Sequence, residues 1–182
     1  MKIVTIGREF GSGGREIGRR IAEALHYDYY DSEIISDIAK HTELAEEYVR
    51  KVVDHEAHQL YPITIARTMV SFPNPSLKMN IDIYKAQCKV IQAMAAKSDC
   101  VIVGRCADYI LRENNPFKIF VCADMEKRIS RCKERNPDQY SSDREWKKAI
   151  EKVDNNRAKY YEFFTNATWG RQAPLWEVVS VL

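Results

Sequence analysis

The segment from Gly7 to Gly18, GREFGSGGREIG, has the composition of a loop that surrounds a phosphate group, because five of its twelve residues are glycine. Glycine permits positive φ angles and leaves room for backbone N–H groups to converge on an anion, which the positive end of a following helix also attracts. A tight turn with close helix packing would account for one or two of these glycines. We predict that the whole bend binds phosphate: Gly11, Ser12, Gly13 and Gly14.

Two nucleotide-binding templates match this segment in part. The dinucleotide fingerprint G-x-G-x-x-G is matched at Gly11 and Gly13, but Glu16 stands where the third glycine belongs. Asp31 lies at about the right distance to be the ribose-binding acid of that template. The triphosphate template G-x-x-x-x-G-K-S/T, counted from the first glycine, has neither its lysine nor its hydroxyl residue. The segment alone leaves both a dinucleotide and a nucleoside triphosphate open.

Two arginines are placed where they could meet an anion. Arg105 follows the apolar run CVIVG, so its guanidinium should emerge at the ligand-binding edge of a sheet, where it could hold a phosphate bidentately or pair with Asp108. Arg157 lies on the apolar stripe of a long predicted helix, four residues after Val153. An unpaired charge would be costly there, so Arg157 should meet an anion, either the side chain of Asp154 or a ligand.

Strand-like patterns recur along the chain and would position these residues. Apolar or β-branched runs predict strands at residues 2–6, 27–31, 100–104, 117–123 and 174–182. Runs that are apolar throughout suit strands that are buried on both faces of a parallel sheet. Helical patterns alternate with these runs, so we predict an α/β fold with a three-layer, doubly wound parallel sheet whose ligands bind at the carboxyl ends of the strands.

Helical periodicity predicts the segments that connect the strands. We expect helices at residues 15–25, 83–95 and 124–135, and a long one opened by a capping box of Ser142 and Glu145. Two charged helices are expected from Ser32 to about Val53, the second opened by Thr42. The proline-rich stretch 61–79 is the least regular part and is predicted to be a mobile connection.

Composition narrows the class of protein. A length of 182 residues predicts one domain, 1–182, and a hydrophobic share of 45% favours a folded core. No apolar run approaches the roughly 20 residues of a membrane-spanning helix. The net charge of +2 is too small to favour nucleic acid as a partner.

Cysteine and histidine usage bears on the compartment and on metals. We expect no secretory signal, because the sequence leads directly into a strand-like segment. The five cysteines are an odd number without a C-x-x-C pair, so we expect reduced thiols and a cytoplasmic location. The four histidines have no ligand spacing, so no protein-bound metal cluster is expected.

Four motifs occur in order along the chain: REFGSGGREI, YYDSEII, VIVGRCADYIL and VDNNRAKYYEFFTNATWG. They resemble the cytidylate kinase-like family of nucleoside monophosphate kinases over nearly the whole length. The resemblance implies a P-loop kinase fold with a core at 1–31 and 84–182, a helical acceptor-binding segment at about 32–83 and a lid at about 136–146. It also implies that ATP, with its Mg²⁺, phosphorylates CMP or a similar small acceptor. A homodimer is possible.

The resemblance implies roles for the residues singled out above. Arg15, at the start of the first helix, would supply the charge that lysine gives in P-loop kinases, although arginine is longer and planar. The expected catalytic residues are Arg15, Arg105 and Arg157. The expected ATP- and phosphate-binding residues are Gly11, Ser12, Gly13, Gly14, Arg15 and Arg131. The expected acceptor-binding residues are Asp31, Ser32, Arg105, Asp108, Asp154 and Arg157.

Several of these residues also have simple structural roles. Ser12 could form the turn, Asp31 or Ser32 could cap a helix, and Arg131 could be a solvated residue on a helix face. Five aromatic residues are expected in the core, with base stacking as the lesser alternative: Tyr160, Tyr161, Phe163, Phe164 and Trp169.

The chain departs from the family pattern at positions that matter for activity. The P-loop lysine is absent, and Glu16 falls near the hydroxyl residue that usually ligates Mg²⁺. Val103 replaces an acid before the Gly-Arg pair, and Asp37 stands near an expected arginine. Two alternatives to a kinase therefore remain. One is a nucleotide-binding protein without catalysis, and the other, from the glycine pattern and Asp31, is a dinucleotide-dependent enzyme.

Overall fold

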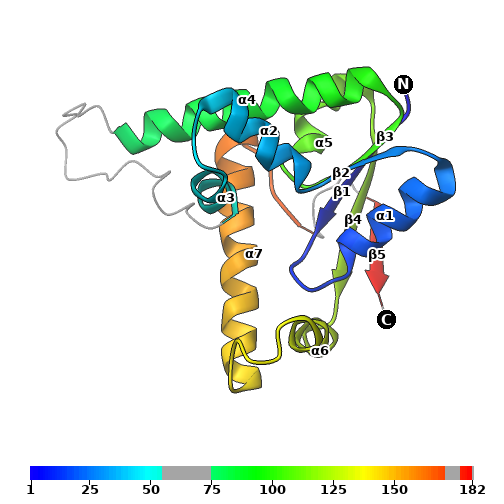
Figure 1. Cartoon of the computed structure of the whole chain (residues 1–182). Coiled ribbons are helices and arrows are strands. Elements are labelled where there is room, and N and C mark those ends of the chain that lie inside the picture. Colours follow the sequence, from blue (N-terminus) through cyan, green and yellow to red (C-terminus); the bar gives the residue numbers. More distant parts are fainter. Residues whose placement is uncertain (55–74, 171–176, 182) are drawn as a thin grey trace.

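One parallel β-sheet forms the centre of the molecule (Figure 1). The computed structural model describes residues 1–54, 75–170 and 177–181. The strands lie in the order β2-β3-β1-β4-β5, and every neighbouring pair is parallel. Their bounds are Ile3–Arg8 for β1, Asp28–Tyr30 for β2, Cys100–Val103 for β3, Phe117–Ala123 for β4 and Glu177–Val181 for β5. All carboxyl ends therefore lie at one edge of the sheet, where ligands bind in such folds.

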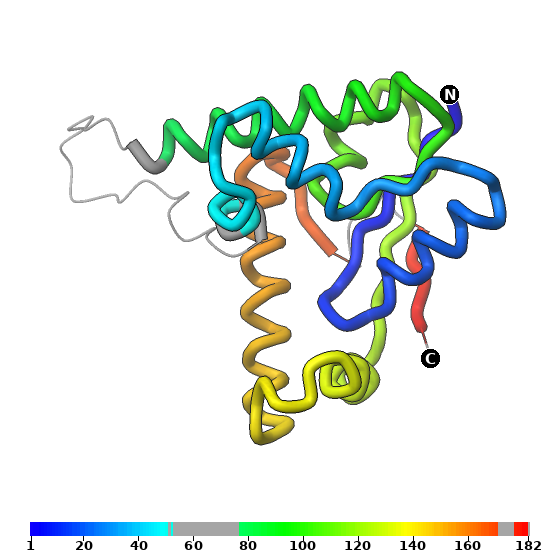
Figure 2. The backbone as a smooth tube through the Cα atoms, viewed as in Figure 1, coloured from blue at the N-terminus to red at the C-terminus, as the bar shows by residue number. Residues whose placement is uncertain are grey.

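Helices connect the strands and cover both faces of the sheet (Figure 1). They are α1 Gly14–Leu25, α2 Glu33–Thr42, α3 Glu46–Asp54, α4 Pro75–Lys97, α5 Ala107–Ile110, α6 Met125–Arg135 and α7 Asp143–Thr165, with a 3₁₀ turn at Arg112–Asn114. In Figure 2 the chain passes from α6 into α7 at the end of α7 that is distant from α4. None of the helices in the described ranges is long and apolar enough to cross a lipid bilayer.

Alternating side chains of the central strands pack into two separate apolar cores. On β3, Cys100 and Ile102 pack with residues of α2, α4, α5 and α7, whereas Val101 and Val103 pack with α1. β1 divides in the same way. A strand that is apolar on both faces needs helices on both sides. The predicted three-layer, doubly wound sheet is therefore confirmed.

The second charged helix begins later than the sequence predicts. Thr42, expected to open it, is instead the last residue of α2. Its hydroxyl donates to the carbonyl oxygen of Ile38 at 2.9 Å, so it bonds back into its own helix rather than capping the next one. The chain turns at Glu43, with a φ of +56°, and α3 begins at Glu46.

The helix α4 spans the predicted boundary between the helical acceptor-binding segment and the core. It runs without a break from Pro75 to Lys97, so the expected limit at residue 84 between helical segment and core falls within one helix. The prediction of an irregular segment at 61–79 is wrong for residues 75–79, which are helical, and the rest of that stretch lies outside the described residues.

The segment expected to be a lid, 136–146, is only partly a loop. The predicted capping box is present: Ser142 accepts from the N–H of Glu145, whose side chain accepts from the N–H of Ser142. The helix α7 therefore starts at residue 143, which leaves 136–142 as the connection. Trp146 is buried in the apolar cluster between α6 and α7.

Candidate active site

The glycine-rich loop between β1 and α1 has the conformation that its glycines permit. Gly11 and Gly13 have φ angles of +77° and +90°. A Cβ atom on Gly11 would lie 2.9 Å from the carbonyl oxygen of Arg128, so α6 passes close to the loop. The helix α1 begins at Gly14, directly after the bend. The strand, bend and helix thus have the arrangement of an anion-binding loop.

A hollow of about 230 Å³ lies in front of the loop. It is lined by five of the residues predicted to bind phosphate: Gly11, Gly13, Gly14, Arg15 and Arg131. Ser12 is instead fully buried, and its hydroxyl donates to the carbonyl oxygen of Glu9 at 2.9 Å. The side chain of Ser12 therefore holds the turn, which is one of its two predicted roles. Arg131 donates to the carbonyl oxygens of Gly11 and Ser12, at 3.3 Å each.

Asp154 supports the loop from α7. One carboxylate oxygen accepts from the backbone N–H of Phe10 at 2.8 Å, and the other accepts from Arg128. Arg128 also donates to the carbonyl oxygen of Phe10 at 2.7 Å. Burial raises the pKa of Asp154, and the neighbouring guanidinium groups of Arg128 and Arg157 oppose that rise. Asp154 lines neither this hollow nor the cavity described next, so its acceptor-binding role stays a prediction.

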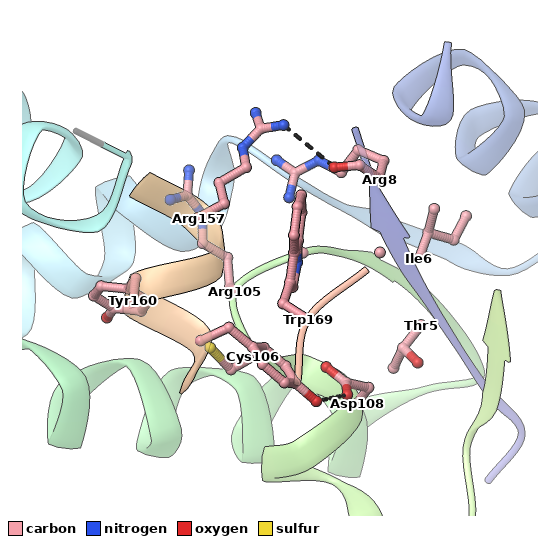
Figure 3. A pocket seen from close by; sticks show the side chains of 12 residues that line it. Thr5, Ile6, Arg8, Arg105, Cys106, Asp108, Arg157, Tyr160 and Trp169 are labelled. Atoms are coloured by element: carbon pink, nitrogen blue, oxygen red, sulfur yellow. Dashed lines mark hydrogen bonds between the residues drawn. The ribbon is translucent and has the colours of Figure 1, made fainter. Parts of the chain in front are cut away.

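A smaller cavity, of about 40 Å³, lies at the carboxyl edge of β1 and β3 (Figure 3). Three arginines from different elements line it: Arg8 at the end of β1, Arg105 just after β3, and Arg157 in α7. Arg8 and Arg157 also line the hollow in front of the loop, so the two spaces share a wall. Guanidinium groups gathered around one small cavity favour an anion such as phosphate.

The side chain of Arg157 is largely buried, with 13% of its surface exposed, as the apolar stripe of its helix predicts. Its Nη1 donates to the carbonyl oxygen of Arg8 at 3.3 Å and lies 3.7 Å from a carboxylate oxygen of Asp154. Its guanidinium is 5.5 Å from the ring centre of Phe10. Arg157 therefore contacts Asp154, which is one of its two predicted partners. It also lines both spaces, and its contact with a ligand stays a prediction.

The turn after β3 has an uncommon backbone conformation. Gly104, Arg105 and Cys106 have φ angles of +73°, +59° and +54°. Left-handed backbone is disfavoured for residues that carry a Cβ, and such strain gathers at functional sites. The side-chain amide of Gln87 donates to the carbonyl oxygen of Arg105 at 2.9 Å, which fixes the turn from α4.

Asp108, in α5, lines the small cavity and is buried. The hydroxyl of Tyr161, in α7, donates to its carboxylate at 2.5 Å. Burial raises the pKa of Asp108, while the hydrogen bond from Tyr161 acts to lower it. Burial also raises the pKa of Tyr161, and the charge of Asp108 adds to that rise.

Asp31 and Ser32 lie at the start of α2 and line neither space. The carboxylate of Asp31 forms an ion pair with the Nε of Arg15 at 2.8 Å. The backbone N–H of Asp31 donates to the carboxylate of Glu33 at 3.2 Å. Ser32 is at the N-cap position but makes no side-chain capping hydrogen bond. Of the predicted acceptor-binding residues, Arg105, Arg157 and Asp108 line the small cavity together, whereas Asp31 and Ser32 do not line it.

Two further observations concern what the site could hold. The hydroxyl of Thr5 is buried at the small cavity and has no hydrogen-bond partner among the residues that the structure describes. Burying a hydroxyl without a hydrogen bond costs roughly 1–3 kcal/mol of folding free energy, which a hydrogen bond to a polar ligand could recover. In the described ranges, no three His, Cys, Asp or Glu side chains are grouped to hold a metal ion. Delivery of Mg²⁺ with a nucleotide stays a prediction.

Arg8 is the site residue that the sequence analysis missed. The first strand was expected to end at Ile6, but it continues to Arg8, which pairs with Val121 of β4. A signal was available, because β1 ends in Ile-Gly-Arg and the run at β3 ends in Val-Gly-Arg. The same reasoning that placed Arg105 at the ligand edge applies to Arg8.

Comparisons with known proteins agree with this architecture. The model of the cytidylate kinase-like family matches residues 3–174. An uncharacterized protein from Eubacterium ventriosum has 24% identity and a TM-score of 0.64, covering 99% of this chain and 89% of that one. Shikimate kinase from Bacteroides thetaiotaomicron has 13% identity and a TM-score of 0.51, covering 89% and 82%. These structures show a shared P-loop kinase-like fold. No curated protein matches the chain.

Proposed function

Because the chain belongs to the cytidylate kinase-like family, we propose that it transfers the terminal phosphoryl group of ATP to a small acceptor that itself carries a phosphate, a nucleoside monophosphate such as CMP. Family membership supports a kinase-type enzyme that handles nucleotides. The choice of acceptor rests on the charge around the small cavity, where Arg8, Arg105 and Arg157 gather.

One observation carries the proposal: the hollow at the loop and the cavity at the strand ends share Arg8 and Arg157. Phosphoryl transfer depends mostly on positioning and on stabilisation of negative charge, for which backbone amides and arginines are suitable groups. A donor phosphate chain at the loop and an acceptor phosphate in the cavity would meet at the shared wall. No other described pair of hollows combines a glycine-rich loop with converging arginines.

The residues divide between the two substrates. The bend from Gly11 to Gly14, with Arg15 and Arg131, would hold the donor's phosphates. The fork of Arg105 would hold the acceptor's phosphate, and Asp108 would orient its sugar or base. Mg²⁺ bound to the nucleotide would neutralise part of the phosphate charge.

A coupled assay of phosphoryl transfer from ATP tests the proposal across CMP, dCMP, UMP and AMP. We expect turnover with at least one of them. Arg105→Gln should raise the KM of that acceptor roughly 10- to 100-fold, because a charge-assisted hydrogen bond is worth about 1.5–3 kcal/mol. Arg112→Gln, which changes an arginine side chain that is half exposed, is the matched control and should leave KM unchanged. Absence of transfer to every acceptor would contradict the proposal.

A second candidate is a nucleotide-binding protein without catalysis. Two observations favour it. The loop lacks the lysine of the template, and α1 begins at Gly14. The neighbouring cation, Arg15, is already paired with Asp31. Tight ATP binding without turnover would select it. The ion pair also engages the acid that the dinucleotide template needs, and a fluorescence titration with NADH that shows no response would remove that alternative.

A further inference from the structure

We propose that Arg8 supplies the positive charge that the missing P-loop lysine would bring to the transferred phosphoryl group. This inference rests on the proposed function. It assigns to Arg8 the role that the sequence analysis gave to Arg15. Four features of the structure support it: the packing at Gly14, the packing at Gly104, the position of Arg8 between the two spaces, and the partner of Arg15.

The stem of Arg8 fills the place where a side chain at position 14 would begin. A Cβ atom on Gly14 would lie 2.6 Å from the Cβ and 3.1 Å from the Cγ of Arg8. Real Cβ atoms do not approach other carbon atoms so closely, so a lysine at position 14 and the present Arg8 exclude each other. The presence of Arg8 in this position therefore requires glycine in place of lysine at position 14.

The guanidinium of Arg8 extends over Gly104. A Cβ atom there would lie 1.8 Å from Nη1 and 2.8 Å from Cζ of Arg8. The backbone of Gly104 is itself fixed to β1, because its N–H donates to the carbonyl oxygen of Ile6 at 2.8 Å. Two glycines, one on each side of the shared wall, thus leave space for a single arginine.

Arg8 is held rigidly where the two substrates would meet. It is 8% exposed, its backbone pairs with Val121 of β4, and its carbonyl oxygen accepts from Arg157. It lines both the hollow and the cavity, and in Figure 3 its guanidinium points toward the side of Arg157. A preorganised cation of this kind stabilises charge that develops during reaction without a cost of reorganisation.

Arg15 has a different position. Its side chain is 49% exposed, and its Nε pairs with the carboxylate of Asp31 at 2.8 Å. It lines the hollow but not the cavity. Arg15 is therefore suited to the donor side alone, whereas Arg8 reaches both substrates.

The chemical step is balanced without a proton donor when the acceptor's phosphate is doubly ionised. An oxygen of that phosphate forms a bond to the γ-phosphorus of ATP. The bond from this phosphorus to the β–γ bridging oxygen breaks, and its electron pair leaves with ADP. Negative charge is spread over the oxygens of the transferred group, and the planar fork of Arg8 can bond two of them.

Arg8→Gln and Arg15→Gln form the matched test, with transfer rates and the affinities for ATP and ADP as readouts. We expect Arg8→Gln to lower kcat at least ~100-fold, the scale of losing one charge-stabilising group, and Arg8→Lys to recover part of the loss. Arg8→Gln should also remove the preference for ATP over ADP. Arg15→Gln should weaken both nucleotides alike and lower kcat less than ~10-fold.

The outcomes separate the two proposals. A merely structural role of Arg8 would weaken ATP and ADP equally and lower the urea midpoint, which overturns the inference. A larger kcat loss in Arg15→Gln than in Arg8→Gln also overturns it. If the wild type transfers phosphate to no acceptor, the proposed function fails, but the dependence of the ATP preference on Arg8 still decides the inference by calorimetry.

Discussion

The strands β1 and β3 lie side by side, and the dipeptide Gly-Arg ends β1 and directly follows β3. However, the two arginines are positioned by different backbone conformations. Gly7 and Arg8 stay within β1 and pair with residues of β4. Gly104 and Arg105 lie beyond β3, and both have positive φ. The two guanidinium groups nevertheless line the same cavity.

The difference shows how one sheet edge can present two cations from adjacent strands. Arg8 is held by ordinary strand pairing, which stores no strain. Arg105 occupies left-handed backbone, which costs roughly 1–2 kcal/mol for an L-residue, and Cys106 repeats that conformation. Strain of this size persists only where neighbours enforce it, and the contact from Gln87 is one such neighbour.

The largest expected effect on activity among these variants comes from Gly104→Ala, because it would separate the guanidinium of Arg8 from the turn that carries Arg105. The added Cβ would displace the guanidinium of Arg8 without removing it, so we expect phosphoryl transfer to fall about 100-fold. Urea unfolding should show a loss of only about 1–2 kcal/mol, from the positive φ.

Gly170→Ala is the control for the backbone term. Gly170 also has a positive φ, of +113°, but no atom of the residues that the structure describes lies within 4 Å of its would-be Cβ. A similar loss of stability with nearly normal transfer is expected. Full activity of Gly104→Ala would show that the placement of the Arg8 guanidinium over this glycine does not matter.

A smaller effect is expected from Tyr161→Phe, which removes the support that α7 gives to the segment after β3. Burial raises the folded-state pKa of Asp108 above its usual value of 3.8, so the folded protein binds the proton more readily than the unfolded chain. Stability from this group is therefore greatest below pH 3.8 and falls as pH rises through the raised pKa.

Removing the Tyr161 hydroxyl takes away a contact that lowers this pKa, and the shift widens. The loss in unfolding free energy should be about 1–3 kcal/mol at pH 7 and smaller at pH 4. Tyr160→Phe is the control, since its hydroxyl donates at 3.4 Å to the neutral side chain of Gln87, and its effect should not change over this range. Equal losses at both pH values for Tyr161→Phe would contradict the assignment.

The smallest expected effect is the difference in stability between a glycine and an alanine variant at each arginine. Its sign should be opposite at positions 105 and 8, so it compares the two backbone conformations directly. At position 105 the glycine variant should be more stable than the alanine variant by about 1 kcal/mol, since only glycine tolerates the positive φ without strain. At position 8, in extended backbone, alanine should be more stable by about 0.5–1 kcal/mol. Urea unfolding of the four variants measures both differences, and the same sign at both positions would rule out strain at Arg105.

The fold could be predicted from the sequence because its signals are local. The apolar runs at β3 and β4, the helical stripes and the capping box at Ser142 each lie within a few residues of one another. Thr42 shows the limit of such signals. A threonine can cap the following helix or bond back into its own, and the choice depends on where the chain turns.

The site could be predicted only in part, because its contacts join distant segments. The side chain of Asp154 binds the N–H of Phe10, 144 positions away, and no spacing rule links them. Tyr161 was expected to pack in the core or, as the lesser alternative, to stack on a base, yet its hydroxyl donates to Asp108. Arg8 was missed because the glycine before it suggested the start of a loop, whereas pairing with β4 keeps it in the strand.

The wall that Arg8 and Arg157 form between the two spaces has a consequence for inhibition. Under the proposed function, two separate anions would meet there, and each would lose translational freedom on binding. A single molecule with a nucleoside at each end of one phosphate chain loses it once, and its second half binds at a high effective concentration. A linker that matches the span from the loop to the turn after β3 would therefore make such a bisubstrate compound bind far more tightly than either half.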